Sequence, residues 1–81
     1  MAAILTLYHR EDCHLCEEFH QALQAVLCGK NVVLKRIDID QNPEQRIRFN
    51  DAVPILLADG EEICRYWLDS TKLNDWLAKI G

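Results

Sequence analysis

The sequence predicts an α/β fold with its elements in the order βαβαββα, and three observations lead to this prediction. Residues 3–8 and 32–39 are short apolar runs with the length and composition of buried strands. A segment with helical periodicity joins them, which makes a βαβ unit with parallel strands. Two later apolar runs flank an Asp-Gly pair, as in a hairpin with a two-residue turn.

Length and composition limit the kind of protein. The 81 residues are enough for one small domain, residues 1–81, and exclude two. With 49% hydrophobic and 27% charged residues, the chain is globular rather than disordered. Thirteen acidic residues outnumber nine scattered basic ones, so nucleic acid is not an expected partner. The apolar runs are far shorter than the roughly 20 residues that cross a bilayer, so no membrane association is expected either.

The N-terminus and the cysteine content bear on the cellular compartment. No basic residue precedes the first apolar run, which soon meets the charged residues 9–12, so we interpret it as a strand and not as a secretory leader. This interpretation predicts a cytoplasmic protein. In that compartment, the four cysteines are expected to be reduced or catalytic thiols rather than structural disulfides.

The first helix is predicted between the two N-terminal strands. Apolar residues recur there at helical spacing: Leu15, Phe19, Ala22, Leu23, Val26 and Leu27. Gly29 ends the helix. Because the runs on either side are rich in aliphatic residues, both are predicted to be central strands of the sheet.

The second half of the chain contains a short helix, a hairpin and a final helix. Asn42-Pro43-Glu44 supplies a cap, a proline at the first helical position and an early acid for a helix to about Phe49. Strands at 54–58 and 61–66 are predicted to pair antiparallel around Asp59-Gly60. Asp69 or Ser70 can cap the last helix, whose apolar face comprises Leu73, Trp76, Leu77 and Ile80.

The motif Cys13-His14-Leu15-Cys16 follows the first strand and begins the first helix. Free backbone N–H groups and the positive end of the helix dipole stabilise a thiolate at Cys13. Cys16 lies one turn deeper on the same face, close enough to attack a mixed disulfide formed at Cys13. The spacing therefore predicts that Cys13 is the nucleophile and Cys16 the resolving cysteine of a thiol–disulfide oxidoreductase that requires no dissociable cofactor.

Residues 7–16, the segment Ala52-Val53-Pro54 and the element order resemble the glutaredoxin-like branch of the thioredoxin superfamily over essentially the whole chain. The resemblance implies a thioredoxin-like, glutaredoxin-type fold with a four-stranded mixed sheet and helices on both faces. It also implies a cis bond before Pro54 and substrate contacts at Val53 and at Arg10, the basic residue three positions before Cys13. The implied substrates are protein or low-molecular-weight disulfides.

One segment departs from the family pattern. Glutaredoxins that use glutathione carry a Gly-Gly turn after the last strand, whereas this chain has the bulky sequence Arg65-Tyr66-Trp67 there. Without backbone donors arranged for the γ-glutamyl carboxylate, glutathione is expected to bind weakly. We therefore expect a protein reductant rather than glutathione. The protein is also expected to be a monomer.

Other functions remain open at this stage. Cys13 and Cys16 could form half of a zinc site, but Cys28 and Cys64 are single and belong to different elements, so no metal site is predicted. His20 lies one helical turn after Cys16 and is expected to be a surface side chain. The alternatives to redox exchange are a metal or iron–sulfur cluster carrier that uses Cys13, and an adaptor whose cysteines are incidental.

Five further side chains carry expectations. Cys28 is expected to be a small buried hydrophobe. Cys64 is either structural or a third thiol able to form a mixed disulfide. Trp76 fits the core face of the last helix, whereas Trp67 lies outside the clear periodicities and is expected to contact a partner. His14 either tunes the cysteine pair by its charge or is simply exposed.

Overall fold

The structure, a computed structural model, describes residues 3–50 and 52–80. Its elements follow the predicted βαβαββα order with one addition, a 3₁₀ turn (η1) after the second strand. The elements are β1 (Ala3–His9), α1 (His14–Leu27), β2 (Val32–Asp38), η1 (Ile39–Gln41), α2 (Pro43–Phe49), β3 (Ile55–Ala58), β4 (Glu61–Arg65) and α3 (Ser70–Ile80). Among the described residues, no helix has the length and apolar composition needed to span a bilayer.

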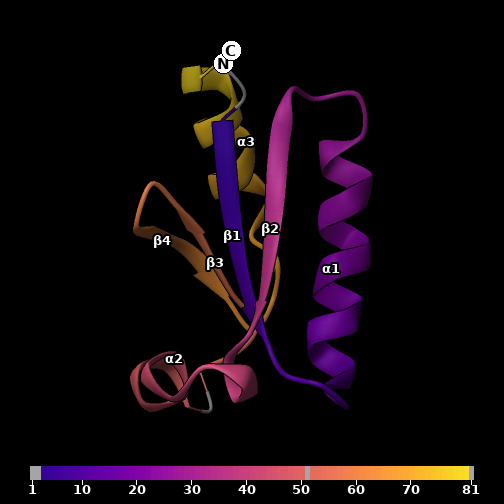
Figure 1. Cartoon of the computed structure of the whole chain (residues 1–81). Helices are drawn as coiled ribbons and strands as arrows, with labels where there is room; N and C mark the ends of the chain where they lie inside the picture. Colours follow the sequence, from indigo (N-terminus) through magenta and orange to yellow (C-terminus); the bar gives the residue numbers. More distant parts are fainter. Residues whose placement is uncertain (1–2, 51, 81) are drawn as a thin grey trace.

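The four strands form one mixed sheet in the order β2-β1-β3-β4. β1 runs parallel to β2 and antiparallel to β3, and β3 runs antiparallel to β4. Parallel neighbours need a long crossover, which α1 supplies; it lies alongside β2 in Figure 1. The predicted mixed sheet is therefore confirmed.

The prediction that both N-terminal strands are central is wrong for β2, which forms an edge of the sheet. Val33 of this strand is 47% exposed. Three of the seven residues of β2 are charged, Lys35, Arg36 and Asp38, which suits an edge strand better than a strand buried on both faces. The strand also ends at Asp38 and not at Ile39, because the Asp38 carboxylate accepts a hydrogen bond from the Asp40 N–H (2.9 Å) and starts η1.

Helices cover both faces of the sheet, as expected. Successive strand residues point to opposite faces. On one face, α1 and α3 pack on the sheet through a cluster of buried residues that includes Leu5, Leu7, Phe19, Leu23, Leu56 and Leu73. On the other face, α2 and η1 contribute to a second cluster that includes Tyr8, Ile39, Phe49, Ile55 and Leu57.

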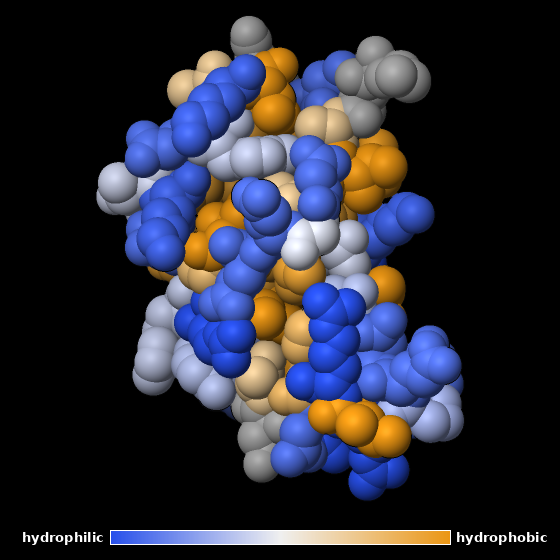
Figure 2. Space-filling view, turned by 90° about the vertical axis from the view of Figure 1, so that its left-hand side faces the viewer, coloured by the Kyte–Doolittle hydropathy of each residue, from blue (hydrophilic) through white to orange (hydrophobic). Residues whose placement is uncertain are grey.

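The predicted turns and caps are present. Asp59 (φ 52°) and Gly60 (φ 84°) are both left-handed, as a tight two-residue hairpin turn requires. The Asn42 side chain accepts hydrogen bonds from the first turn of α2, and the Asp69 side chain accepts one from the Lys72 N–H (3.1 Å) at the start of α3. Seen from the side of the hairpin, hydrophobic groups reach the surface along the middle of this face and in separate places near its upper and lower edges, with hydrophilic side chains between them (Figure 2).

The expectation that Cys28 is buried is wrong, since this cysteine is exposed. It is the C-cap of α1, one residue beyond the helical repeat that carries the apolar face. Gly29 follows with φ 77° and turns the chain away from the helix axis. A cap residue does not continue the buried stripe of its helix, and for this reason the helical periodicity gave no guide to the environment of Cys28.

Candidate functional site

Cys13 is the N-cap of α1. Its backbone is extended (φ −106°, ψ 100°), and its sulfur accepts a hydrogen bond from the Cys16 N–H at 3.1 Å. Asp12, immediately before it, has φ 56° and turns the chain from the end of β1 into the helix. The backbone N–H groups of the first helical turn thus face the sulfur of Cys13.

Cys13 and Cys16 are joined by a disulfide, with their Cα atoms 5.2 Å apart. The two residues differ in access to solvent, because Cys13 is half-buried and Cys16 is 3% exposed. A molecule arriving from solvent can therefore reach the sulfur on the cap more readily than the sulfur inside the helix.

The loop before β3 lies beside the cysteine pair. The Val53–Pro54 peptide bond is cis, as the resemblance implied. Val53 and Cys16 belong to the same cluster of buried residues, and Cys13 packs against that cluster. The Tyr66 N–H donates a hydrogen bond to the Pro54 carbonyl oxygen (2.8 Å), which ties this loop to the segment between β4 and α3.

Arg10, the other predicted substrate contact, forms an ion pair that the sequence reading missed. Its Nε lies 3.1 Å from Oδ2 of Asp40, and Nε of Arg46 lies 3.8 Å from the other oxygen of that carboxylate. The pairing follows from the register, because β1 and β2 are parallel with His9 opposite Asp38, so both chains leave the sheet at the same edge. Partly exposed pairs contribute only about 0–1 kcal/mol, so Asp40 orients Arg10 more than it stabilises the fold.

Acidic side chains flank the cysteine motif in the sequence. Between residues 11 and 29 the chain has four carboxylates, Glu11, Asp12, Glu17 and Glu18, and no lysine or arginine. All four are exposed. His14, whose side chain is 87% exposed, places Nε2 3.1 Å from Oε1 of Glu18. The segment that carries the cysteine motif is therefore acidic and exposed at these four positions.

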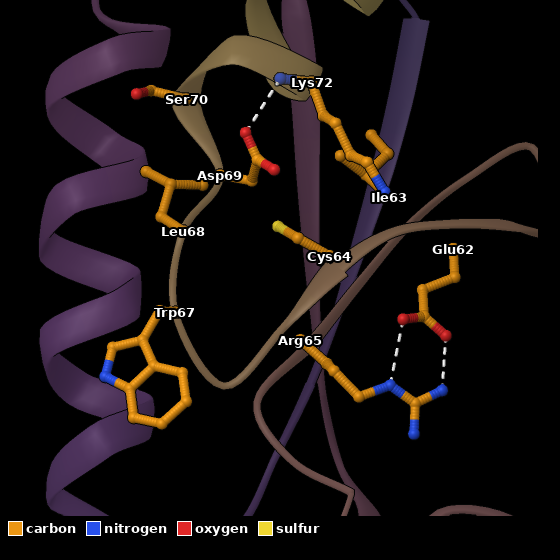
Figure 3. A pocket seen from close by; sticks show the side chains of 9 residues that line it. All are labelled: Glu62, Ile63, Cys64, Arg65, Trp67, Leu68, Asp69, Ser70 and Lys72. Carbon is orange, nitrogen blue, oxygen red and sulfur yellow. Dashed lines mark hydrogen bonds and ion pairs between the residues drawn. The ribbon is translucent and has the colours of Figure 1, made fainter.

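A cavity of about 580 Å³ lies between the end of β4 and the start of α3 (Figure 3). Cys64 lines it, with its thiol directed toward the segment that leads into α3. Burial raises the pKa of this thiol, against a smaller opposing effect from the Asp69 backbone N–H, which hydrogen-bonds the sulfur. Cys64 is thus a poor nucleophile at neutral pH.

Arg65 and Trp67, neighbours in the same segment, point in different directions. Arg65 makes a two-pronged ion pair with Glu62, which holds the pKa of that carboxyl below its usual range (Figure 3). Trp67 lies beside α1 and is 72% exposed. Trp76, in contrast, packs against the core as expected.

Metal-binding groups are not assembled in the described part of the chain. Within residues 3–50 and 52–80, no group of three or more His, Cys, Asp or Glu side chains is placed to hold a metal ion. His20, half-buried on α1, lies near Arg36 and His9, and burial followed by these two basic side chains lowers its pKa. That environment is positive, which opposes cation binding there.

Many solved structures resemble this one, including the following three. The solution NMR structure of protein Ne2328 from Nitrosomonas europaea matches with a TM-score of 0.81 and 36% identity, over 94% of this chain and 92% of that chain. The solution structure of XcR50 from X. campestris matches with a TM-score of 0.71 and 32% identity, over 98% and 95%. Fasciola hepatica thioredoxin, at 23% identity, matches with a TM-score of 0.62 over 96% and 80%, which shows the thioredoxin fold.

Sequence comparison identifies the family of this chain. No curated protein matches the chain. Residues 4–78 match the family model described as Glutaredoxin-like domain (DUF836). The match spans nearly the whole chain. It contains the cysteine motif and all four strands, apart from Ala3, the first residue of β1. The chain therefore belongs to the glutaredoxin-like domain (DUF836) family.

Proposed function

We propose that this protein is a thiol–disulfide oxidoreductase in which Cys13 attacks and Cys16 resolves. One observation carries the proposal: two cysteines at the start of α1 are within disulfide distance, and the sulfur on the N-cap is the more accessible of the two. Membership in a glutaredoxin-like family and the thioredoxin fold support it. The cis Val53–Pro54 loop beside the pair supports it as well.

The exchange proceeds in two displacements. The Cys13 thiolate, favoured by the N–H groups of the first helical turn, attacks one sulfur of a substrate disulfide. A mixed disulfide forms with Cys13, and the other substrate sulfur leaves as a thiolate that takes up a proton. The Cys16 thiolate then attacks the Cys13 sulfur, which closes the Cys13–Cys16 disulfide and releases the second substrate thiol. The substrate gains two electrons and the protein loses two.

Arg10, Val53 and Pro54 are proposed to contact the substrate, with Arg10 held in place by Asp40. The substrates are protein or low-molecular-weight disulfides, and a protein reductant is proposed to restore the dithiol. The bulky segment where glutathione-using relatives carry Gly-Gly is the reason to prefer a protein over glutathione. We further propose that residues 1–81 act as one domain, as a monomer, in the cytoplasm.

Trapping tests the assignment of roles. The reduced Cys16→Ser variant is incubated with a disulfide-containing protein or peptide, and the adduct is located by mass spectrometry. We expect a stable mixed disulfide on Cys13, since attack survives and resolution does not. The Cys13→Ser variant should form no adduct under the same conditions, and the Cys28→Ser variant should cycle like the wild type. Adducts found mainly on Cys16 or Cys28 would contradict the proposed roles.

A further inference from the structure

A groove runs between α1 and the segment that joins β4 to α3. It has a volume of about 280 Å³, and α1 contributes Leu15, Glu18 and Phe19 while the joining segment contributes Tyr66, Trp67 and Leu68. Leu15 stands between the two cysteines of the motif. Neither cysteine lines the groove, but Leu15, which does, is adjacent to Cys16 in the sequence, so the groove starts at the first turn of α1.

The walls of the groove are largely apolar, and Trp67 stands at its edge. The indole is 72% exposed, and its ring meets the ring of Tyr66 edge-on with a centroid separation of 6.0 Å. An exposed tryptophan beside a hollow is a typical anchor of a protein interface, because it can bury a large area on binding with little loss of rotamer freedom. These features indicate an apolar side chain as the occupant of the groove.

The rim of the groove is acidic. Glu18 lines it, Glu17 lies beside Glu18 in the first turns of α1, and Glu11 and Asp12 precede the motif. No lysine or arginine lines the groove or occurs from residue 11 to residue 29, and Arg65, directly before the joining segment, is paired with Glu62. A positively charged partner complements this rim and an anionic one is repelled.

We propose that this groove binds a basic, apolar segment of a partner protein, with the partner's disulfide cysteine next to at least one Lys or Arg and an aromatic or large aliphatic residue. The proposal rests on the proposed oxidoreductase function and specifies its substrate class. The apolar side chain lies against Trp67 and Leu15, and the basic side chain faces Glu17 and Glu18. Cys13 thereby meets a sulfur that the neighbouring contacts have already positioned. Glutathione disulfide, a small anion without a large apolar group, lacks both features.

Four short peptides test the two features separately. Each carries one cysteine as a mixed disulfide with thionitrobenzoate, and its neighbours are basic or acidic, with or without a tryptophan. Reduced protein consumes each disulfide and releases thionitrobenzoate, whose absorbance gives the second-order rate constant. We expect the basic peptide with tryptophan to react about tenfold or more faster than its acidic counterpart at low salt. The ratio should fall toward one near 1 M salt, where the Debye length is about 3 Å.

Variants assign the preference to the groove. Trp67→Ala should remove most of the advantage of tryptophan-containing peptides, about a tenfold effect for an interface anchor. Glu17→Gln combined with Glu18→Gln should reduce the basic preference several-fold and leave the tryptophan preference in place. Glu61→Gln combined with Glu44→Gln removes two exposed negative charges, at the start of β4 and in the first turn of α2, and is the matched control away from the groove. It should keep both preferences.

Binding is measured independently of exchange. A fluorescent basic peptide with tryptophan, in which serine replaces the cysteine, should bind the oxidised protein more tightly than the acidic version, by fluorescence anisotropy. Equal rates for all four peptides together with equal binding would overturn the groove proposal and leave the oxidoreductase function standing. Preferences that persist unchanged in the Trp67 and Glu17/Glu18 variants would also overturn it. Failure of every peptide to react, with selective binding retained, would overturn the oxidoreductase function and leave the groove as a binding surface.

Discussion

The two ends of α1 both carry a cysteine in a cap position, Cys13 at the N-terminus and Cys28 at the C-terminus. Cys28 is the more exposed of the two. The N-terminal end differs in three respects. A backbone N–H group donates to the sulfur of Cys13, a second cysteine lies one turn away, and the loop with the cis bond before Pro54 packs beside the cysteine pair. At the C-terminal end the helix presents carbonyl oxygens instead, and that of Leu27 accepts a hydrogen bond from the Lys30 N–H (2.9 Å). Position on the helix and the neighbouring groups, rather than exposure, distinguish the candidate site.

The largest expected effect separates the two cysteines by activity. Cys13→Ser should reduce the rate of disulfide exchange about a thousandfold or more, to the uncatalysed background, because the attacking sulfur is gone. Cys28→Ser should leave the rate within a factor of two of wild type. Both rates are measured as the loss of a model disulfide substrate over time in the presence of each reduced variant. If Cys28→Ser lost as much activity as Cys13→Ser, the contrast between the helix ends would be wrong.

The next effect concerns what holds α1 in place between its ends. Leu23 is completely buried in the cluster shared with α3, so Leu23→Ala should lower the free energy of unfolding by about 2–5 kcal/mol. Gln24→Ala, one residue on and exposed, should change it by less than about 0.5 kcal/mol. Urea titrations with the cysteine pair reduced in all samples measure both. Equal effects would show that Leu23 does not anchor the helix.

Much of this architecture could be predicted from the sequence, because local signals determine it. Helical spacing, the Asn42 and Asp69 caps and the Asp59-Gly60 turn each involve residues a few positions apart. The environment of Cys28 and the edge position of β2 were missed, since a cap residue lies outside the helical repeat and aliphatic residues occur in edge and central strands alike. The pairing of Arg10 with Asp40 depends on strand register, which no local pattern specifies.

The groove illustrates the same limit for the candidate site. The cysteine motif and the cis bond before Pro54 were visible in the sequence, as a spacing and a resemblance. That Trp67 lies across from Leu15 depends on how α1 packs beside the β4–α3 segment, which are some 50 residues apart in the chain. The acidic composition of residues 11–29 is visible in the sequence, but only the structure shows that one of these carboxylates, Glu18, lines a groove.

A smaller effect should appear in the reactivity of the two cap cysteines. In the reduced native protein at neutral pH, Cys13 should be alkylated by iodoacetamide about tenfold faster than Cys28, since a helix N-terminus favours a negative charge and a C-terminus opposes it. Mass spectrometry of samples quenched over time gives both rates. In denaturant the helix is lost, and the two rates should converge. Native rates that are equal, or faster at Cys28, would contradict the role of the helix N-terminus.

Gly29 offers a test of the C-terminal end alone. It has φ 77°, and a Cβ there would meet no atom within 4 Å, so Gly29→Ala adds backbone strain without a clash. The free energy of unfolding should fall by about 1–2 kcal/mol. Gly60→Ala, with φ 84° and equally open surroundings, should cost a similar amount. The exchange rate of Gly29→Ala should stay at the wild-type value, and a large loss of activity would show that the two ends of α1 are coupled.

The smallest effect lies between the ends, at His20. Burial, then the positive charge of Arg36 and then His9, lower the pKa of His20 below its ordinary value of 6.5. The folded state therefore binds fewer protons than the unfolded state once the pH drops below about 6.5, so stability should be constant above this pH and decline as the pH falls toward the folded pKa. His20→Gln should remove this part of the decline, and Arg36→Gln, which removes only one of the repelling charges, should remove less. Urea midpoints of the three proteins at about pH 7.5 and pH 5.5 measure the difference. Arg36 belongs to β2, so this effect couples the middle of α1 to the sheet. A decline in stability that is unchanged in His20→Gln would mean that the acid sensitivity comes from other groups in the fold. The charges near the middle of α1 would then have no measurable effect on stability, in contrast to the effect expected of its N-terminal end on Cys13.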